Sequence, residues 1–395
     1  MSACAGVYVL SHVCRVPYTQ PVSKWHFYRG SAYRLAGQDD LALEELRQAV
    51  ADPDGPSEYV LQLAEVLKNR GHLEEAIRWY AQAIARAPSD VAAHIAMGDA
   101  LSDARRLDEA TRCFETAIQL DPVSAEGHIH LGVALIKAGK YAEAEDRLLR
   151  AKALDHDNAW IYHNLGVALS AQGKTREGIE QFHEALKRNE QNPHTHIGLG
   201  YELRKIGQFD EALTHYKRAI ALNPAFAQAR MELGNLLEDM GKYDEAVAEY
   251  GELLRLVPAH PMVHRNLGLA LVRCGRVADA LAHFRQASTL RPDWPDPLNH
   301  LAWLLATNRD AGVRNGLQAV RLATRACELT RYEKPEFLDT LAAAHAESGQ
   351  FDQAVRIAQQ GIDLAIRSGN RDLADRMGNR LRLYQSSQPF HESGL

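Results

Sequence analysis

Apolar residues follow helical spacing along most of the chain, in amphipathic runs of about a dozen residues that are separated by glycine. Glycine ends a helix readily because it adopts positive φ without a steric penalty. These glycines recur every 34 residues, and only Arg105 interrupts their register. The pattern predicts a series of helical hairpins with glycine at each turn. The register comprises Gly37, Gly71, Gly139, Gly173, Gly207, Gly241 and Gly275.

A second series of small residues has the same period and lies early in the second helix of each predicted hairpin. We expect it to let the two helices approach closely, while a large apolar residue one turn later fills the space between them. The small residues are Ala42, Ala76, Ala110, Ala144, Ala212, Ala246 and Ala280, with Gly178 in the remaining place. The large ones include Tyr80, Phe114, Phe182, Tyr216, Tyr250 and Phe284. Proline, which cannot continue a helix, then follows at 88, 122, 224, 258 and 292.

These residues resemble the tetratricopeptide repeat, most clearly at Leu199, Gly200, Leu203, Gly207, Ala212, Tyr216, Ala219 and Pro224. The leading aromatic position departs from the family pattern, because it holds Tyr162 once and histidine at His26, His94, His128, His196 and His264. The resemblance implies an all-α fold, a right-handed α-solenoid superhelix of stacked helix-turn-helix hairpins. It also implies that the first helices line a concave groove that binds peptides or protein segments.

The register divides the chain into four parts. Residues 1–22 form an N-terminal segment that is either a cap or disordered, and residues 23–294 hold eight regular repeats. In residues 295–366 a longer turn shifts the register, which predicts two divergent hairpins. Residues 367–395 are expected to form a capping helix and a tail, because an array must cover its last apolar face. The repeats are 23–56, 57–90, 91–124, 125–158, 159–192, 193–226, 227–260 and 261–294.

Charge and cysteine content restrict the environment and the class of partner. The chain has 51 acidic and 45 basic side chains, so no strong positive field favours nucleic acid. Its five cysteines include no closely spaced pair, which indicates reduced thiols and a cytoplasmic protein. A periplasmic or lipid-anchored location is the alternative if translation starts upstream of this sequence. No apolar stretch reaches the length of a membrane span.

The sequence offers little for catalysis, a cofactor or a metal. The repeats leave no room for an ordinary catalytic domain, so we expect no enzyme activity. The Gly173-Lys174-Thr175 stretch lacks the earlier glycine and the strand of a phosphate-binding loop. The histidines at 128 and 130 lie two residues apart, which places them on different faces of a helix. We therefore interpret the recurrent histidines as structural.

The predicted groove has an apolar and aromatic centre. In the fifth repeat, Tyr162, Leu165 and Leu169 form the packed stripe, and Trp160 lies on a second stripe of the same helix. Large aromatic residues dominate binding hot spots, which favours Trp160 and Tyr201. Packing between adjacent repeats is the alternative, above all for Ile129 and Ile197. The candidate groove residues are Ile129, Val133, Ile136, Trp160, His163, Val167, Ile197, Tyr201 and Arg204.

Two functions remain open on this evidence. The first is a non-catalytic scaffold that binds a peptide or protein segment in the groove. The second is an adaptor subunit of an enzyme or secretion complex that docks through its C-terminal repeats, with Arg309, Arg314, Arg321 and Arg325. The terminal repeats also allow a homo-oligomer.

Overall fold

The computed structural model describes residues 21–392, and within that range the chain consists of helices joined by short turns, without a strand. The chain forms two compact units. The first ends at Glu202 and the second begins at Leu203. The predicted N-terminal segment 1–22 lies outside the described residues, except for its last two positions.

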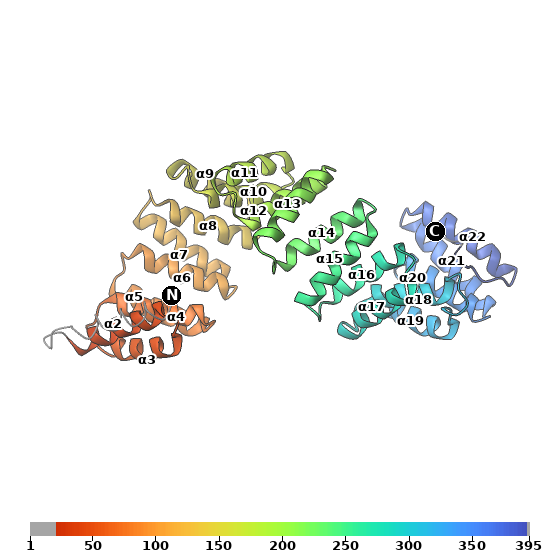
Figure 1. Cartoon of the computed structure of the whole chain (residues 1–395), viewed down its shortest axis with the longest axis horizontal. Helices are drawn as coiled ribbons and strands as arrows, with labels where there is room; N and C mark the ends of the chain where they lie inside the picture. The colour runs from red at the N-terminus through yellow and green to blue at the C-terminus, as the bar shows by residue number, and fades with distance from the viewer. Residues whose placement is uncertain (1–20, 393–395) are drawn as a thin grey trace. The chain divides into compact units, whose positions relative to one another are not determined.

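The first unit contains the helices that are coloured red to yellow-green in Figure 1. They are α2 (Val22–Leu35), α3 (Asp39–Val50), α4 (Ser57–Asn69), α5 (Leu73–Arg86), α6 (Val91–Asp103), α7 (Leu107–Leu120), α8 (Ala125–Lys137), α9 (Tyr141–Leu154), α10 (Ala159–Ala171) and α11 (Thr175–Arg188). The boundary between the units falls within α12 (Pro193–Lys205).

The second unit continues in green and blue to the last helix. Its helices are α13 (Phe209–Leu222), α14 (Ala227–Asp239), α15 (Tyr243–Leu256), α16 (Pro261–Arg273), α17 (Val277–Leu290), α18 (Pro295–Thr307), α19 (Gly316–Leu329), α20 (Pro335–Glu347), α21 (Phe351–Arg367) and α22 (Arg371–Gln385). None of the described helices is long and apolar enough to cross a bilayer.

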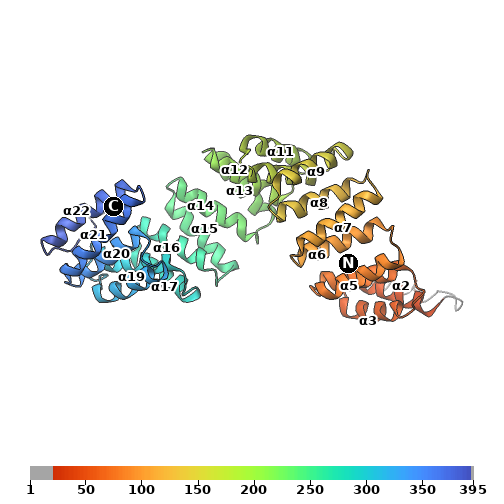
Figure 2. The same cartoon turned by 180° about the vertical axis from the view of Figure 1, so that it is seen from behind.

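Within each unit, the two helices of a hairpin pack on each other, and the second helix packs on the hairpin that follows, from α2 to α11 and from α13 to α22. Thus α8 packs on α9, α9 packs on α10, and the first helices α6, α8 and α10 also touch one another in sequence. Figure 2 shows these consecutive hairpins of the first unit side by side from behind. The all-α architecture of stacked hairpins predicted from the 34-residue period is confirmed.

Glycine ends the first helix of most hairpins in the left-handed conformation, as the register predicts. Gly173, for example, has a φ of 79°. Arg105, which replaces glycine once in the series, adopts the same conformation with a φ of 62°. A side chain with a Cβ is strained there, because the Cβ approaches the following carbonyl oxygen. The hairpin turn therefore imposes positive φ on Arg105, although arginine favours negative φ.

Close packing within a hairpin depends on small residues in both helices. The alanines predicted near the start of each second helix are fully buried. The first helix contributes a glycine that receives the large side chain of the second. A Cβ added at Gly166 would lie only 2.7 Å from the ring of Phe182, and one at Gly234 would lie 2.4 Å from the ring of Tyr250.

The recurrent histidines at 94, 196 and 264 bind the backbone of the preceding turn. His94 Nε2 lies 3.0 Å from the carbonyl oxygen of Pro88, and His264 Nε2 lies 3.0 Å from that of Pro258. Tyr162 donates the equivalent hydrogen bond to the carbonyl oxygen of His156, at 2.9 Å. This position therefore ties the first helix of a hairpin to the chain six residues earlier, which gives its histidines a structural role.

The last helix buries an apolar face against the final hairpin through Leu373, Met377 and Tyr384. The helical spacing of α22 predicts that Arg380 lies largely away from this face, and the structure shows that this prediction is wrong. Its side chain is only 12% exposed, and its guanidinium pairs with Asp339 of α20 at 2.5 Å. A charged group in this position is tolerated because its partner is buried beside it.

Candidate functional site

A cleft of about 680 Å³ opens on the first-helix side of the first unit. It lies between the N-terminal halves of α8 and α10, with one residue from α6. Its lining consists of Asp99, Ser124, Ala125, Glu126, Ile129, His130, Val133, Asp155, Asn158 and Trp160. The cleft thus combines an aromatic ring and two branched aliphatic side chains with several polar groups, which is the usual make-up of a binding site.

Two capping residues fix where the helices that border the cleft begin. The Ser124 hydroxyl accepts from the Gly127 amide at the start of α8, at 3.5 Å. Asn158 Oδ1 accepts from the Trp160 amide at the start of α10, at 3.0 Å. Because side chains of the first turn project near the cap, these caps place Glu126 and Trp160 at the mouth of the cleft.

Trp160 is a large aromatic side chain on the surface, yet its position is held. The residue is 44% exposed, and its ring stacks on the imidazole of His163, with 5.0 Å between centroids and 13° between planes. Asn164 Nδ2 donates to the Trp160 carbonyl oxygen at 2.7 Å, within the same helix. A rigid, half-exposed aromatic ring loses little conformational entropy when a ligand covers it.

His163 forms a buried support beneath the tryptophan. Its Nδ1 lies 3.0 Å from Thr195 Oγ1 of α12, and its ring contacts Phe182 at 5.8 Å between centroids. Burial, with a smaller contribution from the nearby His194, lowers the pKa of His163 to about 4. The imidazole is therefore neutral at pH 7 and acts as a packing and hydrogen-bonding group.

The rim of the cleft is acidic. Asp99, Glu126 and Asp155 contribute carboxylates, and neither lysine nor arginine is among the lining residues. His130 lies between two of these acids, with Nδ1 2.8 Å from Asp99 Oδ1 and Nε2 3.9 Å from Glu126 Oε1. The cleft consequently offers negative charge beside the exposed face of Trp160.

Seven of the predicted groove residues differ in burial and in whether they line the cleft, and Ile129 is both buried and part of the lining. Ile129, Val133 and Trp160 come together in the cleft. Ile129, His163 and Ile197 are buried, with 7%, 8% and 6% exposure, so packing accounts for most of their surface. Ile136 and Val167 are half-buried and are not in the cleft lining.

The two remaining predicted residues lie near the end of α12. Tyr201 is 47% exposed and belongs to the first unit. Arg204 belongs to the second unit, where its guanidinium bonds Asp239 at 2.5 Å and Glu232 at 3.4 Å. These contacts with α14 give Arg204 a structural role within its own unit.

The groove residues predicted from the sequence do not include the polar residues of the cleft, namely Asp99, Glu126, His130, Asp155 and Asn158. Asp155 and Asn158 occupy the turn before α10, and the signal that could have identified them is their position as turn and capping residues next to Trp160. His130 was considered only as a metal ligand. Among the described residues, no cluster of three or more histidine, cysteine or acidic side chains is arranged to hold a metal ion.

Family models agree with the repeat pattern. The model of the cilia and flagella-associated protein 70 C-terminal domain, a tetratricopeptide-repeat model, matches residues 29–260, which is more than half of the 395 residues. Two further tetratricopeptide repeat models match residues 231–297 and 335–360. No curated protein sequence matches the chain.

Several solved structures are similar to this one. A monomeric mutant of IFIT1 with Gppp-AAAA has a TM-score of 0.54 at 17% identity, over 96% of this chain and 94% of that one. YrrB, described as a tetratricopeptide-repeat protein with an unusual peptide-binding site, has a TM-score of 0.41 at 25% identity, over 47% and 96%. PilF of Pseudomonas aeruginosa has a TM-score of 0.48 at 20% identity, over 54% and 96%. From its repeats, its helical hairpins and the matching family models, the chain belongs to the tetratricopeptide repeat family.

Proposed function

We propose that this protein is a non-catalytic, cytoplasmic scaffold that binds a segment of another protein in the cleft of its first unit. The observation that carries the proposal is the state of Trp160. Trp160 is 44% exposed at the mouth of the cleft, it lies in the first turn of a capped helix, and its ring stacks on His163. It is therefore a preformed anchor. Such anchors provide much of the affinity in protein interfaces.

The charge of the cleft supports a segment that carries lysine or arginine. A cation over the face of a tryptophan gains about 0.5–2 kcal/mol, and the carboxylates of Asp99, Glu126 and Asp155 add attraction at the rim. Ile129 and Val133 supply an apolar wall for a neighbouring side chain. The best fit is therefore an extended segment with a basic residue next to an apolar one.

The same charges weigh against nucleic acid in this cleft. Carboxylates at the rim repel phosphates, and sequence-independent binding of nucleic acid depends on lysine and arginine contacts to the backbone. The alternative of docking through the arginines of the C-terminal repeats has less support. Arg314 is 17% exposed and bonds Glu347 at 2.9 Å, and Arg325 pairs with Glu328 at 3.3 Å.

Selection of peptides from a random 12-residue display library on the intact protein tests the proposal. We expect the selected peptides to share a basic residue beside an apolar one. Trp160→Ala should weaken the best of them by about 2 kcal/mol, or roughly thirtyfold in Kd. Glu126→Gln combined with Asp155→Asn should weaken binding and reduce its dependence on salt.

A matched control is available in the same unit. Trp25 is also a partly exposed tryptophan at 37%, but it lies outside the cleft. Trp25→Ala should leave the affinity of the selected peptides unchanged. Equal loss in the Trp25 and Trp160 variants, or selection of acidic peptides, would contradict the assignment of the cleft.

A further inference from the structure

The chain turns back after the last helix of the second unit. Ser387 has a φ of 55°, and residues 388–392 belong to neither a helix nor a strand. The amide of Glu392 donates to the carbonyl oxygen of Thr307, at the end of α18, at 2.8 Å. We call residues 386–392 the return segment. It connects α22 with α18, helices that are far apart in sequence.

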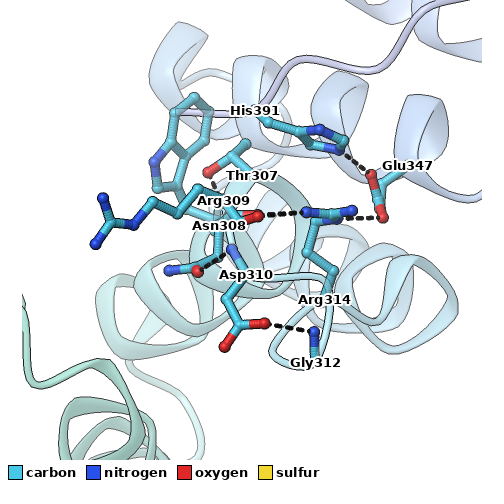
Figure 3. A network of polar contacts seen from close by, with 9 residues as sticks. Thr307, Asn308, Arg309, Asp310, Gly312, Arg314, Glu347 and His391 are labelled. Carbon is cyan, nitrogen blue, oxygen red and sulfur yellow. Dashed lines mark hydrogen bonds and ion pairs between the residues drawn. The ribbon is translucent and has the colours of Figure 1, made fainter. Parts of the chain in front are cut away.

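Side chains of the return segment meet complementary groups on the helices. Glu392 Oε1 accepts from the indole nitrogen of Trp303 at 2.7 Å. His391 Nε2 lies 2.7 Å from Glu347 Oε2, at the end of α20. Figure 3 shows the imidazole of His391 directed toward Glu347, with Arg314 on the other side of that carboxylate.

The third contact is made by Phe390. Its ring lies 6.2 Å from that of Trp303, and the guanidinium of Arg380 lies 5.3 Å from the phenylalanine ring and 5.4 Å from the tryptophan ring. Arg380 is oriented by a bidentate pair with Asp339, at 2.9 and 2.5 Å. Phe390 therefore joins a slot that is formed by an aromatic ring and an oriented cation.

The carboxylate of Glu347, which contacts His391, is held in place by residues of the repeats and not by the return segment. Arg314 Nε donates to Glu347 Oε1 at 2.9 Å, and its Nη1 bonds the carbonyl oxygens of Asn308 and Arg309, at 2.9 and 3.1 Å. Figure 3 shows this network beneath His391. If the return segment only covered an apolar surface, these oriented hydrogen-bonding groups would not be needed. One backbone bond, one aromatic slot and two polar side-chain contacts are typical of the recognition of an extended peptide.

We propose that Trp303, Thr307, Glu347 and Arg380 form a second peptide-binding site, independent of the cleft in the first unit. It recognises an extended segment with the order aromatic, histidine, acidic. The return segment occupies the site in cis, and a partner segment with the same chemistry binds by displacing it. The effective concentration of a tethered segment is high, so even a weak intrinsic contact keeps the site occupied until a partner is present.

The test weakens the binding of the return segment in the full chain and then measures the binding of a separate peptide with the same sequence. In the variant Phe390→Ala, Glu392→Ala, which we call the vacated variant, the return segment has lost two of its contacts. A fluorescent peptide with the sequence SSQPFHE should bind this variant at least tenfold more tightly than it binds the unchanged protein. The same peptide with alanine in place of phenylalanine is the control, and it should bind both proteins weakly.

A third variant distinguishes loss of a specific hydrogen bond to the peptide from loss of aromatic packing. Trp303→Phe keeps an aromatic ring but removes the donor to Glu392, so in the vacated variant it should weaken the SSQPFHE peptide severalfold without a loss of helix content. Equal binding of the peptide to the vacated and unchanged proteins would overturn the proposal, as would equal binding of the alanine peptide. If the unchanged protein forms a dimer that the Phe390 substitution dissolves, the site binds a second copy instead, and the proposed partner is wrong.

Discussion

The buried histidine under Trp160 predicts a local loss of stability in mild acid. His163 is 8% exposed, and its burial lowers the pKa to about 4. In the unfolded chain the ordinary value of about 6.5 returns. Because the folded pKa is the lower one, the fold favours the neutral ring. Its stabilising contribution is complete above about pH 6.5 and is lost as the pH falls toward 4.

The size of this effect follows from the two pKa values. A pKa difference of one unit corresponds to about 1.4 kcal/mol, so the complete loss below pH 4 amounts to about 3 kcal/mol. Between pH 7.5 and pH 5 the same values give a loss of about 2 kcal/mol. Protonation also places a charge between Trp160 and Phe182 and next to the Thr195 hydroxyl. The stability of α10 should therefore decrease more than that of helices without such a group.

Hydrogen exchange, resolved by peptide and corrected for the intrinsic rates, measures the local free energy of opening in α10. In His163→Asn the amide replaces Nδ1 as the partner of Thr195 but does not titrate. The native protein should lose about 2 kcal/mol more than this variant between pH 7.5 and pH 5. His72→Asn, at an exposed histidine of the same unit, should behave like the native protein. Equal losses in the native protein and the His163 variant would refute the reasoning.

Three further substitutions test the packing by urea unfolding. Arg105→Gly should stabilise the first unit by about 0.5–1 kcal/mol, because it relieves left-handed strain but increases the entropy of the unfolded chain; a loss of stability would contradict the strain at Arg105. Gly166→Ala should cost about 1–2 kcal/mol, since overpacking against Phe182 outweighs the better helix propensity of alanine; a more stable variant would show that the ring can move aside. Asp339→Asn should cost the second unit about 3–5 kcal/mol, because it leaves the Arg380 guanidinium buried without its anion; an unchanged midpoint would mean that the pair contributes nothing.

The hairpins could be predicted because each requirement is local and repeats in the sequence. Turn glycines, small residues near the start of the second helix and large residues one turn later all concern contacts within 20 residues. Arg105 shows the strength of this register, since its backbone follows the glycine conformation. Helical spacing also placed Trp160 outside the packed stripe, and its exposure agrees with that prediction.

Other parts of the candidate sites depend on contacts that no local pattern records. The burial of His163 and Ile197 is set by how closely neighbouring repeats cover the first-helix face. The contact between Trp303 and Glu392 joins residues that are 89 positions apart. The burial of Arg380 depends on Asp339, a partner that lies on another helix. The two partners of such a charged pair are not related by a regular spacing in the sequence, so only the structure identifies the pair.

The central claim is that a segment of another protein binds in the cleft beside Trp160. A footprint of a selected peptide on the intact protein, measured by hydrogen exchange, tests it most directly. We predict slower exchange in the first two turns of α8 and α10 and unchanged exchange in α14 and α16, and we predict that Trp160→Ala removes the protection. Protection confined to the second unit, or protection that survives in the Trp160 variant, would contradict the account.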